Sequence, residues 1–81
     1  MLKGDDYKNV CDNIRWLRQR YGLSRTAMAK KLHISIKTLD LLEAGIFPEQ
    51  IHIGFFFQVY QAFGIPPKML LTTRLEETVD M

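Results

Sequence analysis

Two serines in the middle of the chain each precede a short helical segment, and only three residues separate the two segments. Ser24 precedes the run RTAMAKKL, and Ser35 precedes the run IKTLDLLEA. A serine at such a position accepts a hydrogen bond from a backbone N–H of the first helical turn. The pattern therefore predicts two helices joined by a turn at residues 33–35. His33 occupies the tight position of that turn, where a positive φ is expected and histidine is among the more tolerant non-glycine residues.

The second of these helices, predicted over residues 36–44, has two chemically different faces. At 100° per residue, Leu39, Leu42 and Glu43 point one way. The opposite face carries Lys37, Asp40, Leu41 and Ala44. A glutamate on the inward face costs free energy unless a cation pairs with it. Arg18, beside the apolar stripe of the preceding helix, is the expected partner, and we predict an ion pair between Arg18 and Glu43.

Helical periodicity predicts three further helices, which makes the fold class all-α, a compact bundle of about five short helices. The first is expected over residues 9–21 and the fourth over residues 53–63. The last begins at Pro66 and Pro67, because proline suits a first helical turn. The inward residues expected in these three helices are Val10, Ile14, Leu17 and Tyr21, then Phe56, Val59, Tyr60 and Phe63, then Met69, Leu70 and Leu71.

The length of the chain favours a single domain. With 81 residues, of which 47% are hydrophobic, there is enough apolar material for one modest core and not for two. We place the domain at residues 9–71. Residues 72–81 are polar and acidic, and they are expected to form a frayed C-terminal tail.

Basic residues are concentrated in one half of the sequence. The formal net charge is only +2, yet residues 8–37 hold eight of the eleven Lys and Arg residues and a single acid, Asp12. A basic half beside a more acidic remainder suits a protein that binds a polyanion such as nucleic acid.

Several classes of protein are disfavoured by what the chain lacks. Cys11 is the only cysteine, and His33 and His52 are the only histidines, so we expect no disulfide, no metal site and no cofactor. Residues 1–6 carry charge, and the apolar stretch 51–65 is too short to span a membrane, so a soluble cytoplasmic protein without a signal peptide is expected. No nucleophile–base pair or phosphate-binding glycine loop suggests an enzyme.

The spacing of these features resembles the phage repressor or Cro-type helix-turn-helix family, also called the xenobiotic-response-element family, of bacterial and phage regulators. Its pattern is an apolar–alanine pair, a turn, a capping residue, an apolar residue and then Glu-x-Gly, filled here by Met28, Ala29, Ser35, Leu39, Glu43 and Gly45. The resemblance extends upstream through Arg18 and Gly22 and downstream to Leu70, so it covers residues 9–71.

The resemblance implies a lambda-repressor-like fold and sequence-specific binding of double-stranded DNA, with the helix over residues 36–44 in the major groove. It places Ser24 and Arg25 against a phosphate, with Ser35 and Thr38 near the backbone. The residues that would face base edges are Ile36, Lys37 and Leu41, with Asp40 nearby. A transcriptional regulator that binds as a homodimer is the expected function, and Arg18 and Glu43 would be structural.

A second hypothesis remains open, because the outward face of residues 36–44 is unusual for a helix that contacts bases. Ile36 and Leu41 are apolar, Asp40 is acidic, and Lys37 is the one obvious cation. Apolar groups can contact a thymine methyl and an acid can accept from cytosine N4. Alternatively, Ile36 and Leu41 bind another protein, and the chain is an interaction module with an antitoxin-like or accessory role.

Overall fold

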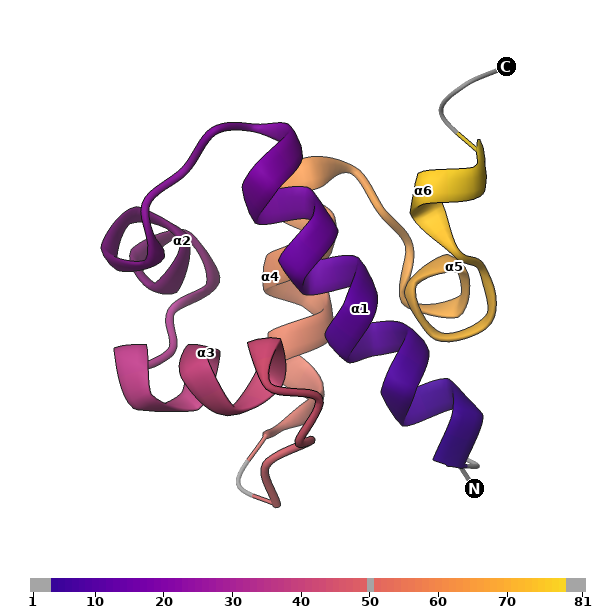
Figure 1. Cartoon of the computed structure of the whole chain (residues 1–81), viewed down its shortest axis with the longest axis horizontal. Coiled ribbons are helices and arrows are strands. Elements are labelled where there is room, and N and C mark those ends of the chain that lie inside the picture. The colour runs from indigo at the N-terminus through magenta and orange to yellow at the C-terminus, as the bar shows by residue number, and fades with distance from the viewer. Residues whose placement is uncertain (1–3, 50, 79–81) are drawn as a thin grey trace.

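The longest helix of the computed structural model runs through its middle, with the shorter helices on either side (Figure 1). The structure describes residues 4–49 and 51–78, and within them every regular element is a helix. In chain order these are α1 (Gly4–Arg20), α2 (Arg25–Leu32), α3 (Ile36–Glu43), α4 (Ile53–Phe63), α5 (Pro67–Thr72) and α6 (Leu75–Thr78). The all-α class predicted from periodicity is confirmed, with one helix more than expected.

α1 contacts α3 on one side and α5 and α6 on the other, while α4 lies behind it in the view of Figure 1. The helix begins at Gly4, about one turn before the predicted start at residue 9. Tyr7 accounts for the extra turn, because its ring packs against Phe47 with centroids 4.7 Å apart. Tyr21, predicted to continue the buried stripe of α1, lies beyond the helix and is exposed.

One cluster of apolar side chains, drawn from all six described helices, forms the core. Its members are Val10, Cys11, Ile14, Leu17, Met28, Ala29, Leu32, Leu39, Leu42, Phe55, Val59, Leu70 and Leu75. No helix in the described part of the chain is both long and apolar enough to cross a membrane. Burial raises the pKa of the Cys11 thiol to about 11, so this thiol is protonated at neutral pH.

The inward face of α4 differs from the predicted one. Phe55 and Val59 are buried, whereas Tyr60, expected inside, is exposed. α4 packs against α2 and α5, and this packing turns its 55–59 side inward. Aromatic residues occur on every side of the helix, so periodicity alone could not show which side faces the core.

The segment expected to be a frayed tail from residue 72 contains α6, and its Leu75 is buried in the core. Asn13 of α1, itself buried, fastens this segment. Its Nδ2 donates to the carbonyl oxygens of Leu70 at 2.9 Å and Thr73 at 2.8 Å, and its Oδ1 accepts from the N–H of Leu75 at 3.1 Å. One side chain thus satisfies three backbone groups that lie where α5 ends and α6 begins.

Replacing Asn13→Ala should therefore destabilise the protein by roughly 2–3 kcal/mol, because buried backbone groups lose their partners. Asn9→Ala is the matched control, since Asn9 makes a single part-buried bond to the carbonyl of Leu71. Its cost should stay below about 1 kcal/mol. Urea denaturation followed by circular dichroism measures both, and equal losses would show that Asn13 has no special role.

Candidate nucleic-acid interface

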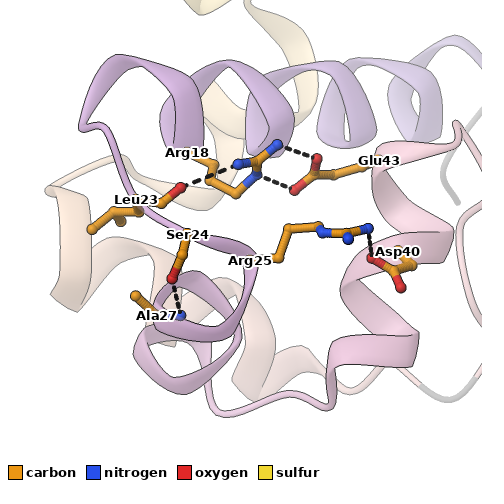
Figure 2. Close-up of polar contacts among 7 residues, drawn as sticks. All are labelled: Arg18, Leu23, Ser24, Arg25, Ala27, Asp40 and Glu43. Carbon is orange, nitrogen blue, oxygen red and sulfur yellow. Dashed lines mark hydrogen bonds and ion pairs between the residues drawn. The ribbon is translucent and has the colours of Figure 1, made fainter.

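α2 and α3 each begin at a serine whose hydroxyl caps the helix. Ser24 Oγ accepts from the N–H of Ala27 at 3.1 Å (Figure 2). Ser35 Oγ accepts from the N–H of Thr38 at 3.0 Å and donates to its Oγ1 at 2.9 Å. Both serines have extended backbone angles, as an N-cap requires. These two hydroxyls, which we predict to lie near a DNA backbone, are thus already used to cap α2 and α3.

The turn at residues 33–35 fixes how α3 leaves α2. His33 has φ 58° and ψ 41°, and it is the one non-glycine residue with positive φ in the described chain. The N–H of Ile34 donates to the carbonyl of Ala29 at 3.0 Å, and that of His33 to the carbonyl of Lys30 at 3.2 Å. Together these bonds close the C-terminus of α2 in a left-handed cap, and α3 begins at once.

An ion pair between Arg18 and Glu43 joins α1 to the end of α3 (Figure 2). Arg18 donates from Nε to Oε2 at 2.6 Å and from NH2 to Oε1 at 2.8 Å, and its NH1 donates to the carbonyl of Leu23 at 3.1 Å. The side chains are only 21% and 13% exposed. The hydrogen bonds to Glu43 raise the pKa of the Arg18 guanidinium, which therefore stays charged.

The two faces of α3 differ in how far their side chains are buried. Leu39 and Leu42 are fully buried, and α3 packs against α1 and α2. On the other side, Ile36 is 45% exposed. The remaining outward residues are Lys37 and Asp40, both exposed, Leu41, which is half-buried, and Ala44, which is exposed. In Figure 1, α3 lies at the edge of the molecule away from α5 and α6.

A second ion pair links the start of α2 to the outward face of α3. Arg25 NH1 donates to Asp40 Oδ1 at 2.9 Å, with both side chains about half exposed (Figure 2). The resemblance places Arg25 against a phosphate and Asp40 near bases, and nothing in the sequence predicts that the two side chains pair. In the sequence, only the opposite charges of Arg25 and Asp40 hinted at this pair. Neither residue belongs to the turn at residues 33–35, which brings α2 and α3 together. Arg25 still has other N–H donors, and one of its five is used here.

The basic half of the sequence does not form a single basic surface. Arg18 is occupied by Glu43, and Arg15 lines a polar hollow of about 230 Å³ with Arg74 and Glu76 on the α6 side. The exposed bases on α2 and α3 are Arg25, Lys30, Lys31 and Lys37. A moderate positive charge therefore remains around these two helices, partly offset by Asp40.

Comparison with protein-family models, with curated proteins and with solved structures found no match to this chain.

Replacing Glu43→Ala should destabilise the fold by about 2–4 kcal/mol, because the half-buried Arg18 would lose its two bonds to the carboxylate. Asp40→Ala also removes a carboxylate from α3 and breaks an ion pair, but an exposed one, so its cost should stay below about 0.5 kcal/mol. Thermal and urea unfolding compare the two variants. An unchanged melting temperature for Glu43→Ala would show that the pair contributes nothing to stability.

Proposed function

We propose that this chain binds double-stranded DNA in a sequence-specific manner, as a transcriptional regulator of the helix-turn-helix type with a lambda-repressor-like fold. The supporting observation is the arrangement of α2 and α3, two capped helices joined by three residues. The inner side of α3 is fixed to α1 by Arg18 and Glu43, and its outer side is open. A helix presented in this way can enter the major groove, which admits one α-helix.

The outward face of α3 supplies the candidate base contacts. Lys37, exposed near the start of the helix, can donate to the O6 and N7 acceptors of guanine. Ile36, at the first helical position and exposed, can pack against the methyl group of thymine. Leu41 is half-buried and therefore adds less contact area.

The start of α2 supplies the candidate phosphate contact. The positive end of the helix dipole and the first backbone N–H groups favour an anion there. Arg25 is held beside α3 by Asp40, so its unused N–H donors lie at the flank of the helix that would contact bases. Ser35 and Thr38, at the start of α3, would also face the backbone, and Thr38 lines a hollow with His33 and Gln58 that does not include Asp40.

Lys37→Ala and Arg25→Ala should weaken binding in different ways. Lys37→Ala should cost about 1–3 kcal/mol on the preferred site and relax the preference at one base pair. Arg25→Ala should weaken binding on every sequence and lower the slope of log K against log salt by about one unit. The preferred site comes from selection with a random duplex library, and titrations at several salt concentrations give both quantities.

Asp40→Asn is the matched control for Arg25→Ala, because it breaks the same ion pair from the other side. Removal of a negative charge from the DNA-facing surface should strengthen binding on all sequences, where Arg25→Ala weakens it. Equal affinity of the wild type and both alanine variants for the selected site would refute these roles.

The contact assigned to Ile36 can be tested without changing any other group on the DNA. Replacement of single thymines in the selected site by deoxyuridine removes one methyl group each. At the contacted position the affinity of the wild type should fall by about three- to ten-fold, the worth of one buried methyl or slightly more. Ile36→Ala should bind the two duplexes equally. The same loss in both proteins would place the methyl contact elsewhere.

A protein-interaction module is the second candidate, and two observations favour it. Ile36 exposes nearly half of its surface, and Asp40 offsets the charge of Arg25 on the same face. The library selection separates the candidates. Enrichment of a defined motif supports sequence-specific DNA binding, whereas residual, purely salt-sensitive binding without enrichment supports the interaction module.

A further inference from the structure

A groove of about 660 Å³ lies between the start of α1, the connection from α3 to α4, and the first turn of α4. Its size falls within the range of about 300–1,000 Å³ that is common for small-molecule sites. The apolar residues that line it are Tyr7, Phe47, Pro48, Ile51, Ile53 and Phe56. None of them has a role in the proposed DNA site on α3, so the groove is a separate feature of the molecule.

Three of the lining side chains are aromatic, and each is held by a neighbour. Tyr7 and Phe47 pack against each other with their ring centroids 4.7 Å apart and their planes tilted by 43°. Phe56 meets the buried Phe55 edge to face, with 5.5 Å between the ring centroids. The three groove rings are only half-buried, so part of each stays accessible. The face of an aromatic ring carries negative charge density and attracts cations.

Glu49 is the one charged residue among those that line the groove. Its side chain is exposed, and within residues 4–49 and 51–78 it makes no hydrogen bond or ion pair. A carboxylate beside aromatic rings favours a ligand that is apolar and carries a positive charge. A neutral apolar molecule gains nothing from the carboxylate, and an anion is repelled both by it and by the ring faces.

The residues around the groove do not supply such a cation themselves. Residues 46–63, which include the connection and all of α4, contain no lysine or arginine. A second copy that presented the same segments would therefore bring a further carboxylate towards Glu49 and no cation from them. The chemistry of the groove fits a foreign cation better than it fits this surface of another copy.

We propose that the groove binds a small hydrophobic organic cation, with the rings of Tyr7, Phe47 and Phe56 against its apolar body and Glu49 beside its positive charge. The proposed DNA site on α3 does not enter this inference, and the tests contain no DNA. They can therefore fail or succeed independently of the proposed function.

Tetraphenylphosphonium and tetraphenylborate test the proposal, because the two ions share one shape and carry opposite charges. Isothermal titration calorimetry of the full chain measures their affinities. The chain has a net charge of +2, so general electrostatic attraction favours the borate. The wild type should nevertheless bind the phosphonium at least about three-fold more tightly. Equal affinities, or tighter binding of the borate, would overturn the proposal, because they would indicate unselective contact with an apolar surface.

Glu49→Gln tests the role of the carboxylate. Its affinity for the phosphonium should fall about three- to five-fold, the contribution of one exposed charge pair, while its affinity for the borate should not fall. Glu77→Gln is the control, because it changes the net charge equally at an exposed α6 position outside the groove. It should keep the wild-type affinities. Melting temperatures check that both variants fold, and a Glu49→Gln variant that still prefers the phosphonium contradicts the proposal.

Proton–nitrogen correlation spectra locate the bound phosphonium. The largest shifts should occur at the amides of Phe47, Glu49, Ile51 and Phe56. Largest shifts on α2 or α3 would place the ion elsewhere and overturn the proposal. So would shifts of the groove amides with rising protein concentration in the absence of the probe, because these would show that a second copy covers the groove.

Discussion

The bidentate ion pair between Arg18 and Glu43 is the interaction on which the placement of α3 depends. A carboxylate at the core-facing edge of α3 is tolerable only because a guanidinium meets both of its oxygens. The same guanidinium also binds the carbonyl of Leu23, just before α2 begins. One side chain of α1 therefore fixes the end of α3 and the approach to α2, and the outward direction of α3 follows from that restraint.

The features of the fold that could be predicted from the sequence are those set by neighbours along the chain. Ser24 and Ser35 cap helices because a cap involves residues three positions away, and His33 adopts positive φ at a turn of three residues. The role of Asn13 could not be found in this way. Asn13 binds backbone groups about sixty positions further along the chain. Nothing in the sequence around a polar residue of the α1 stripe indicates which distant groups it will contact.

The candidate site shows the same limit. The division of α3 into a buried face and an open face follows from periodicity, and the structure places Leu39 and Leu42 inside as expected. The pairing of Arg25 with Asp40 and the dispersal of the basic residues could not be predicted, because both depend on how the turn directs α3 and how α1 is rotated. The number of charged residues can be counted from the sequence. The direction in which each charged side chain points cannot be.

If α3 contacts bases as proposed, its length limits how many base pairs one copy can distinguish. Eight residues make a helix about 12 Å long, which matches the rise of about four base pairs. A given sequence of four base pairs recurs by chance about once in 250 positions. Two such sequences at a fixed spacing recur only about once in 65,000 positions, whereas a genome offers 10⁶ or more competing sites. If α3 contacts bases as proposed, association of two copies would reduce the chance matches among 10⁶ sites from about 4,000 to about 15.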